Sequence, residues 1–277
     1  MQRSLLLISL IAVCNAESLD LTRKTVTQSS TWCDNPTQNK DEYSANKAID
    51  GKTETCSHTK GENSSWWNID LLGVYDISSV TIYNKNSNNG NIDKAQIHIS
   101  NSRRDNFTAN SKYINITDFK MQQYNNYSVN ASGRYITVFS SALKFIVVCE
   151  ININATKKAS PFKLITQDKT WVEALEHCRD KNMELASIIN EETQAWAELE
   201  AMNAVSAHVW LGLRYTCTLN FWFWISDHVV KFDRWDPERN TTNNCDESAV
   251  MRKSDYLWVP TPDGEKHNFI CSKDTFQ

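Results

Sequence analysis

The hydrophobic and polar positions of this 277-residue chain follow two different periods. Between residues 17 and 155, short β-branched runs partly alternate with polar positions, and the gaps between runs are rich in Asn, Ser and Gly. The clearest runs are residues 77–83, 96–100, 134–139 and 144–153. Such runs predict strands, and several short strands around one core predict an antiparallel β-sandwich.

A domain boundary is expected at residues 156–161, TKKASP, where the hydrophobic signal stops. The segment is basic, has small side chains and ends in proline, which is typical of a linker. After it, the hydrophobic period changes from two to nearly four. We therefore expect an all-β domain at 17–155 and a second domain at 162–277, in line with about 100–200 residues per domain.

Two amphipathic helices are predicted early in the second domain. Thr170 and Glu173 form a capping-box pattern, and Asn190 is the expected cap of the second helix. The positions expected to face a core are Trp171, Ala174, Leu175 and Cys178, then Ala195, Trp196, Leu199 and Met202. Strand-like runs return at 209–213 and 221–225, so this domain is predicted to be α+β.

Residues 1–16, MQRSLLLISLIAVCNA, have the pattern of a signal peptide. Arg3 precedes a hydrophobic run, and Ala16 supplies a small residue at the exit site. The run is too short for a stable anchor, and no later hydrophobic run is long enough for a membrane helix. The mature protein is therefore expected to be secreted and extracellular, with no membrane span.

Charge and motif content exclude two classes of function. The formal net charge is -4 and 22% of residues are charged, with no basic stripe, so nucleic acid is not an expected partner. An enzyme is not expected either. His58 has no serine or cysteine nucleophile at motif spacing, and the chain lacks a Gly-rich phosphate loop and an H-E-x-x-H motif.

Seven cysteines remain once Cys14 leaves with the signal peptide. In an oxidising compartment we expect disulfides rather than a zinc site, and the odd number leaves one cysteine outside the pairs. Seven N-x-[ST] sequons agree with secretion, although a chain so rich in Asn produces some by chance. These predicted glycosylation sites are Asn63, Asn106, Asn115, Asn126, Asn130, Asn154 and Asn240.

Several ordered motifs in the first domain resemble the F-type lectins, or fucolectins. They are KAIDG at 47–51, CSHT at 56–59, WWNIDL at 66–71, VTIYN at 80–84, and the closing runs at 133–138 and 148–151. The resemblance implies a β jelly roll with a structural calcium ion. It also implies a disulfide between Cys56 and Cys149, which would tie the calcium loop to the last strand.

The family's calcium ligands can be carried over position by position. The resemblance assigns side-chain oxygens to Asp50, Thr55 and Glu150, and backbone carbonyls to Lys47, Lys52 and Cys149. Carboxylate and carbonyl oxygens are what a hard cation prefers, and Asp-Gly provides a ligand followed by a sharp turn. The alternative is that Asp50 only begins a turn and Glu150 is only a strand-end carboxylate.

The family's fucose pocket is degenerate in this chain. Fucolectins bind fucose with a histidine, two arginines and a stacking pair of adjacent cysteines. Here His58 keeps its place, but Lys85 replaces the first arginine, Asn88 and Asn89 replace the cysteines, and the second arginine falls on Asn91 or its neighbour. A lysine cannot reproduce the rigid donor fork of arginine. We expect weak fucose binding or none at His58, Lys85 and Asn91; alternatively, His58 is a loop histidine without a ligand.

The second half resembles the C-type lectin-like fold. The matching runs, in that family's order, are residues 162–165, 171–178, 185–188, WLGL at 210–213, and 268–271. The resemblance implies a disulfide between Cys178 and Cys271. Cys245 has lost its usual partner, so Cys217 is a candidate substitute. Cys33 then lies outside the pairs, and it could remain a thiol or link two chains into an oligomer.

Calcium-dependent sugar binding is not expected in this second domain. The family's first triplet falls in residues 235–240, where Asp236 and Glu238 could ligate a cation, but its second falls at 258–260, which has lost both oxygen donors. The aromatic run at 221–224 could stack on sugar rings. Alternation favours core packing for at least half of it.

Together these features predict a secreted, glycosylated, lectin-like protein that recognises glycans or glycoproteins, and the families imply a role in innate immunity. The alternative is a non-sugar adaptor that binds proteins after both ancestral sugar sites were lost.

Overall fold

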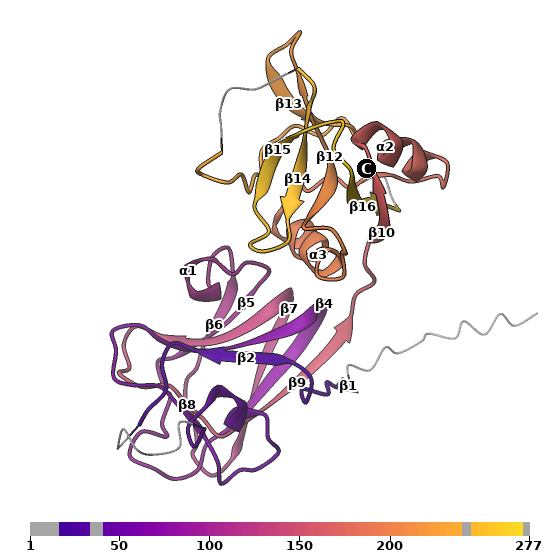
Figure 1. Cartoon of the computed structure of the whole chain (residues 1–277). Coiled ribbons are helices and arrows are strands. Elements are labelled where there is room, and N and C mark those ends of the chain that lie inside the picture. The colour runs from indigo at the N-terminus through magenta and orange to yellow at the C-terminus, as the bar shows by residue number, and fades with distance from the viewer. Residues whose placement is uncertain (1–16, 34–40, 240–244, 274–277) are drawn as a thin grey trace, which may run out of the picture.

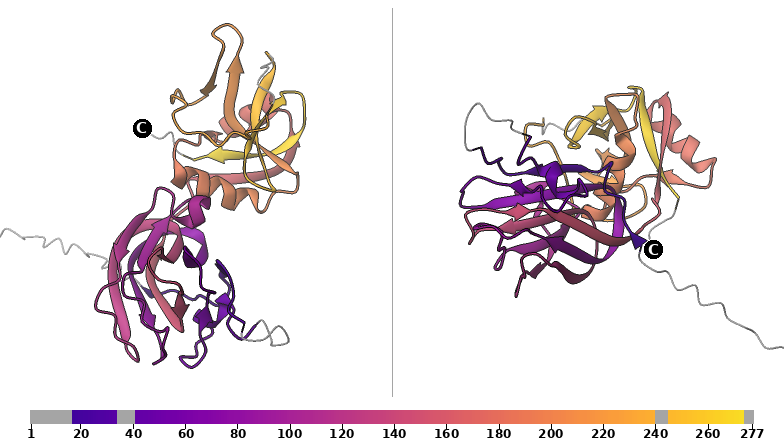
Figure 2. Two further views of the ribbon diagram at one scale, coloured as in Figure 1. Left: turned by 90° about the vertical axis from the view of Figure 1, so that its left-hand side faces the viewer. Right: turned by 90° about the horizontal axis from the view of Figure 1, so that it is seen from below.

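The computed structural model describes residues 17–33, 41–239 and 245–273, which form two strand-rich domains (Figure 1). The predicted signal peptide at 1–16 and the sequon at Asn240 lie outside the described residues. Figures 1 and 2 show the second domain seated on one end of the first, with α3 facing it. The predicted multi-domain architecture, a β-sandwich followed by an α+β domain, is confirmed.

The first domain is built on one strongly bent seven-stranded sheet with strand order β1-β9-β4-β7-β5-β6, in which β2 also pairs with β4. A small second sheet pairs β3 with β8. Its elements are β1 (Glu17–Ser18), β2 (Thr25–Gln28), η1 (Ala45–Ala48), β3 (Ser57–His58), β4 (Ser65–Tyr83), β5 (Gln96–Ser100), α1 (Arg104–Phe107), β6 (Lys112–Asn115), β7 (Tyr124–Ser140), β8 (Val147–Val148) and β9 (Glu150–Lys157).

Two long strands, β4 and β7, run through both layers of this domain. One half of β4 pairs with β2 and with the end of β7, and the other half pairs with β9 and with the start of β7. The register shifts between Asp70 and Tyr75, where the ribbon changes layer. Inward-facing side chains such as Trp67 and Ile136 are fully buried, so alternation along these strands builds the core.

One strand prediction was wrong. The run at 144–153 is not a single strand, because β8 pairs with β3 in the small sheet while β9 begins at Glu150 and pairs with β4. Cys149 lies between the two strands and belongs to neither of them. Its side chain forms a disulfide with Cys56. A β-branched run alone does not reveal that a disulfide divides it.

The second domain has a seven-stranded sheet with order β10-β16-β12-β14-β15, to which β11 and β13 attach. Two helices pack against it. Its elements are β10 (Phe162–Lys169), α2 (Trp171–Arg179), β11 (Glu184–Leu185), α3 (Glu191–Ala201), β12 (His208–Thr216), β13 (Phe221–Trp224), β14 (Glu247–Arg252), β15 (Trp258–Pro262) and β16 (His267–Ser272).

Both predicted helix caps are present. The Thr170 side chain accepts from the Glu173 N–H while Glu173 bonds back to Thr170, and Asn190 forms the equivalent box with Thr193. One core assignment was wrong: Met202 is 40% exposed, because α3 ends at Ala201 and Met202 is only its C-cap. In β13, Trp224 is fully buried and Phe221 is 47% exposed, as the expected alternation requires.

The domains meet at a buried junction. Val74, from the layer change in β4, is fully buried in the hydrophobic cluster of the second domain. Beside it, the guanidinium of Arg134 on β7 is fully buried and contacts Asp70 Oδ2 at 2.7 Å and Glu198 Oε2 of α3 at 3.1 Å. Apolar packing and a buried ion triad therefore join the domains.

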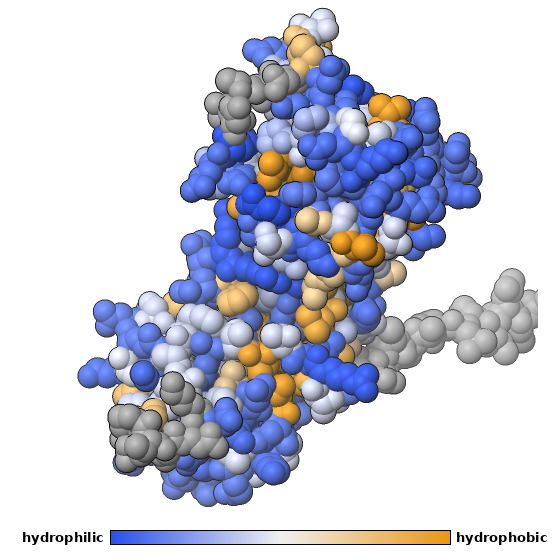
Figure 3. Space-filling view, in the orientation of Figure 1, coloured by the Kyte–Doolittle hydropathy of each residue, from blue (hydrophilic) through white to orange (hydrophobic). Residues whose placement is uncertain are grey.

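Three disulfides join described cysteines, and each links a pair named above: Cys56–Cys149, Cys178–Cys271 and Cys217–Cys245. Of the six described sequon asparagines, all but Asn154 are exposed, and Asn154 is half-buried with its side chain bonded to Ser79. The face in Figure 3 is mostly hydrophilic, and hydrophobic side chains form small separate patches on it.

Candidate functional site

The candidate site begins at a tight loop that follows η1. Gly51 has φ +75°, a conformation that glycine adopts without the steric penalty of a side chain. Its N–H donates to Glu150 Oε2 at 3.1 Å, so the loop is tied to the first residue of β9. The adjacent disulfide between Cys56 and Cys149 ties the same two segments a second time. Two distant parts of the chain are thereby fixed against each other.

Three of the expected calcium ligands present side-chain oxygens at this loop. The Asp50 carboxylate accepts from Thr55 Oγ1 at 2.9 and 2.7 Å and from the Lys52 N–H at 3.0 Å. Lys47 Nζ lies 3.8 Å from Asp50 Oδ2. Burial raises the pKa of Glu150 to about 7, and the negative charge of Asp50 adds to the rise. Two carboxylates and a hydroxyl at one loop are a donor set that fits a hard cation.

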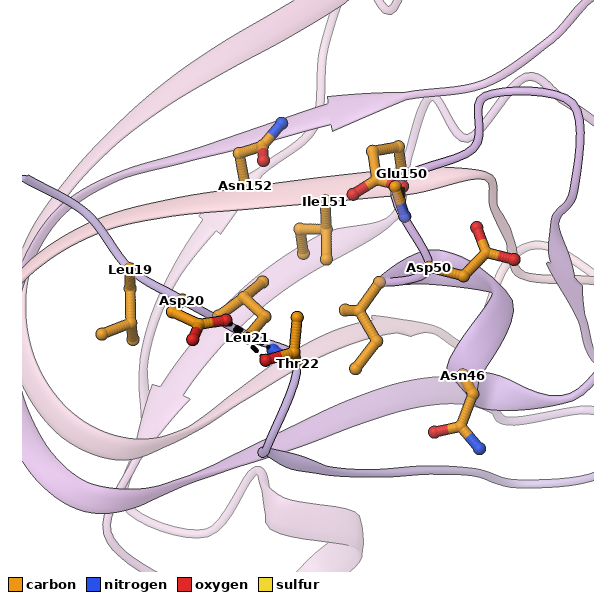
Figure 4. A pocket seen from close by; sticks show the side chains of 11 residues that line it. Leu19, Asp20, Leu21, Thr22, Asn46, Asp50, Glu150, Ile151 and Asn152 are labelled. Carbon is orange, nitrogen blue, oxygen red and sulfur yellow. Dashed lines mark hydrogen bonds between the residues drawn. The ribbon is translucent and has the colours of Figure 1, made fainter.

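The described residues contain no cluster of three or more His, Cys, Asp or Glu side chains that could hold a metal ion. The expected set would not form such a cluster, because Asp50 and Glu150 are its two carboxylates and a hydroxyl and backbone carbonyls supply the rest. A cavity of about 500 Å³ lies beside the loop. Figure 4 shows Asp50 and Glu150 on one side of it and Asp20 and Thr22 on the other.

His58 lies next to this loop on β3, where it pairs with Val147 of β8. Its ring is surrounded by aromatic rings whose centroids lie 5.2 Å (Trp32), 6.0 Å (Tyr43) and 5.4 Å (Phe145) away. We call His58 and these three rings the His58 cage. Its members are half-buried.

The polar groups around the His58 cage differ from those expected. His58 Nδ1 lies 2.6 Å from the Thr59 carbonyl oxygen, and its Nε2 lies 3.4 Å from Asn89 Nδ2. Asn91, the residue chosen from the motif, instead accepts from the Asp93 N–H at 2.8 Å. The residue next to the histidine is thus Asn89, which stands at one of the two cysteine positions.

Lys85 is directed at the loop of residues 50–55 rather than at His58. Its Nζ donates to the Glu54 carbonyl oxygen at 2.7 Å, and its N–H lies 3.4 Å from Cys149 Sγ. It therefore stabilises the loop from outside. The cage rings were missed in the sequence because Trp32 and Phe145 are far apart along the chain. The Trp32 N–H donates to the His58 carbonyl oxygen at 2.8 Å, and the pairing of β3 with β8 brings the segment that carries Phe145 alongside.

In the second domain, the acidic residues near the ancestral triplet have other partners. Asp236 Oδ2 lies 2.9 Å from Arg252 Nη2, and Asp236 also accepts from the Glu238 N–H at 2.9 Å. These hydrogen bonds hold the pKa of Asp236 below its usual range. Trp258 of the second triplet is fully buried. No helix in the described part of the chain is long and apolar enough to cross a membrane.

The chain has a two-module, lectin-like architecture. The first module is a β-sandwich with a disulfide, an acidic loop and an aromatic cage, and the second is an α+β domain with two capped helices. Two family models match it: a NedA-like, galactose-binding domain over residues 47–138 and the lectin C-type domain over 167–273. Fucolectin of Anguilla anguilla is 30% identical over 125 residues, covering 42% of this chain and 79% of its own length. The chain belongs to the fucolectin family in its first domain and to the C-type lectins in its second.

Further relatives and one solved structure are similar to parts of this chain. Fucolectin-4 of Anguilla japonica is 35% identical over 120 residues, 40% of this chain and 66% of that protein. C-type lectin lectoxin-Phi1 of Philodryas olfersii is 33% identical over 119 residues, 40% of this chain and 76% of that protein. The crystal structure of a fucolectin from Morone saxatilis serum is 24% identical, covers 56% of each chain, and has a TM-score of 0.46. The chain thus spans just under two thirds of fucolectin-4.

Proposed function

We propose that this protein is a secreted glycan-recognition protein whose first domain binds sugars at the His58 cage, next to a loop that holds a structural calcium ion. The observation that carries the proposal is the cage itself. Aromatic rings beside a histidine and an amide are a common way to bind a sugar. The rings contact its C–H face, and the polar groups form hydrogen bonds with its hydroxyls.

The calcium part of the proposal is supported by the oxygen donors at the loop. Asp50, Thr55 and Glu150 supply side-chain oxygens, and the backbone carbonyls of Lys47, Lys52 and Cys149 are the further ligands that we propose. A bound cation would compensate the repulsion between the two carboxylates, and it would fix the segment that carries His58. Its role would be structural.

The proposed ligand is not fucose held in the family's manner. That manner needs guanidinium groups, whereas Lys85 is bonded to Glu54 and the cage offers rings and an amide. At about 1.5–3 kcal/mol for each lost charged hydrogen bond, two missing arginines weaken such binding by roughly two orders of magnitude or more. The cage favours sugars recognised mainly by stacking.

The second domain is proposed to contribute a calcium-independent recognition surface, because its Asp236 carboxylate is engaged by Arg252. Secretion is supported by the three disulfides, which are typical of oxidising compartments. We include in the proposal the innate immune role that family membership suggests. In that role the protein would bind microbial polysaccharides.

A glycan array that includes microbial polysaccharides tests the proposal. The secreted protein is expected to bind a subset of glycans, and His58→Ala is expected to lose that binding at least tenfold, which is about 1.4 kcal/mol. Tyr124→Ala is the matched control, because Tyr124 is 55% exposed on β7 and outside the cage. Absence of any glycan signal, together with capture of a defined protein partner, would instead support the adaptor function.

A further inference from the structure

A second cavity lies on the outer face of the first domain's sheet and shares no lining residue with the His58 cage. Because alternate residues of a strand share a face, β2, β4 and β7 place their outward side chains in two rows across this face. The rows are Thr27, Asn68 and Thr137, then Thr25, Asp70 and Tyr135. The sheet thus forms a polar floor.

The segment around α1 covers this floor and closes the cavity to about 150 Å³. The Phe107 ring lies 5.2 Å from the ring of Tyr135 and 5.5 Å from that of Trp66. Asp105, Asn106 and Phe107 all have positive φ, at 50°, 55° and 65°. A left-handed non-glycine residue costs about 1–3 kcal/mol, and such strain gathers at functional sites. The turn therefore places Phe107 over the sheet at a cost in backbone conformational energy.

The floor keeps hydrogen-bonding capacity toward the cavity. Asn68 is 1% exposed, and its Nδ2 donates to the Ile136 carbonyl oxygen at 3.2 Å and to Thr137 Oγ1 at 2.8 Å. Within the described residues, Asn68 Oδ1 accepts no hydrogen bond. The hydroxyls of Thr25 and Thr27 accept none there either. These atoms can accept or donate to a ligand.

Arg103 supplies donors at the rim. Its Nε donates to the Tyr135 hydroxyl at 2.8 Å, which fixes the guanidinium, while its Nη2 lies as far as 4.0 Å from Asp70 Oδ2. The charge of Asp70 is already balanced by Arg134, which donates to it at 2.8 and 2.7 Å. The cavity is therefore polar without a large excess charge, which suits a neutral polyhydroxylated ligand better than a strong anion.

We propose that this cavity, which we call the α1 cavity, binds a single monosaccharide unit at the end of a glycan. Benzene fills an engineered cavity of about 150 Å³, so this cavity can admit one face of a single pyranose ring but not a longer saccharide. Phe107 offers an aromatic surface for the C–H face of the ring, and Asn68, the threonines and Arg103 meet its hydroxyls. The ligand class follows from these groups and not from the proposed His58 site.

Saturation-transfer NMR with the full secreted chain tests this, using methyl glycosides of fucose, galactose, mannose and N-acetylglucosamine as probes. At least one glycoside is expected to bind in the millimolar range, as one small ligand in an open cavity should. Thr27→Tyr is expected to raise its dissociation constant at least tenfold by filling the cavity. Lys112→Tyr, which places the same aromatic residue on exposed β6, is expected to leave that constant unchanged, and His58→Ala reports separately on the His58 site.

Phe107→Ala provides a second variant, which removes the wall instead of filling the cavity and is expected to weaken the same binding. Equal unfolding temperatures for Thr27→Tyr and Lys112→Tyr would show that the filled variant is folded. Binding that disappears with His58→Ala but persists in Thr27→Tyr would overturn the α1 cavity while supporting the His58 site. Absence of binding by every glycoside, also after enzymatic removal of any glycan at the neighbouring Asn106, would overturn it as well.

Discussion

The buried guanidinium of Arg134 should be the most sensitive polar group at the domain junction. It is fully buried, forms two hydrogen bonds with Asp70 at 2.8 and 2.7 Å, and contacts Glu198 of the second domain at 3.1 Å. Arg134→Met keeps most of the side-chain volume but removes the hydrogen-bonded counter-ion of both buried carboxylates, leaving only Arg103 at 4.0 Å from each. Removing one member of such a pair typically costs about 3–5 kcal/mol.

Urea unfolding and calorimetry of the full chain measure this effect. For a chain of this size, about 1 kcal/mol shifts the unfolding temperature by about 2–4 °C, so the expected loss is roughly 6–20 °C. Glu198→Gln should cost less, because Arg134 keeps its bonds with Asp70. Since Glu198 belongs to α3, both variants should also separate the unfolding of the two domains into distinct transitions.

Arg104 supplies the matched control. Its side chain is 56% exposed and its Nη2 lies 3.0 Å from Glu191 Oε1, also on α3. An exposed pair contributes about 0–1 kcal/mol, so Arg104→Met should change the unfolding temperature little. If Arg134→Met destabilises by less than about 1 kcal/mol, or no more than Arg104→Met does, the account of the junction as a buried ion triad is refuted.

Three further predictions concern the calcium loop, the junction and the ligand. Excess calcium should raise the unfolding temperature of the wild type and of Asp76→Asn, an exposed control on β4, but not that of Asp50→Asn. Calcium at 100 times its dissociation constant adds about 2.7 kcal/mol to the free energy of unfolding. Equal responses of the three proteins in calorimetry would contradict the ligand assignment. Val74→Ala should cost about 1–3 kcal/mol in urea unfolding and Val205→Ala, 83% exposed, about 0.5 or less; equal costs would contradict the packing of Val74 into the second domain. Free fucose should not displace the protein from the glycans it binds on an array, and displacement at low millimolar fucose that persists in Thr27→Tyr but is lost in His58→Ala would show that the ancestral pocket works.

Local signals in the sequence predicted most of the fold. Capping boxes at Thr170 and Asn190 act within one helical turn, and the β-branched runs of β4 and β7 are typical of strands, so both are readable without tertiary contacts. The consecutive buried positions in the middle of β4 and β7 do not follow from alternation, because other parts of the chain cover the second face. The disulfide pairs followed from family motifs. Met202 was misplaced because periodicity continues past the residue at which a helix ends.

Features that depend on distant segments could not be predicted. The His58 cage needs Trp32 and Phe145 beside β3, and the junction needs Val74 to leave its own domain's core, neither of which leaves a periodic signal. The contact between Asn89, at one of the two cysteine positions, and His58 likewise depends on how the loop that carries Asn89 folds back onto β3. Sequence patterns located the Asp50 loop and the segment around His58, and tertiary pairing decided which side chains meet there.

The central claim is that the first domain recognises glycans at the His58 cage, supported by a calcium-holding loop. Isothermal titration of the full secreted protein with its best array glycan, in calcium and then in a chelator, tests it most directly. The account predicts measurable binding in calcium, at least tenfold weaker binding in chelator, and loss of binding in His58→Ala. Equal affinity in calcium and chelator, or unchanged affinity in His58→Ala, would contradict it.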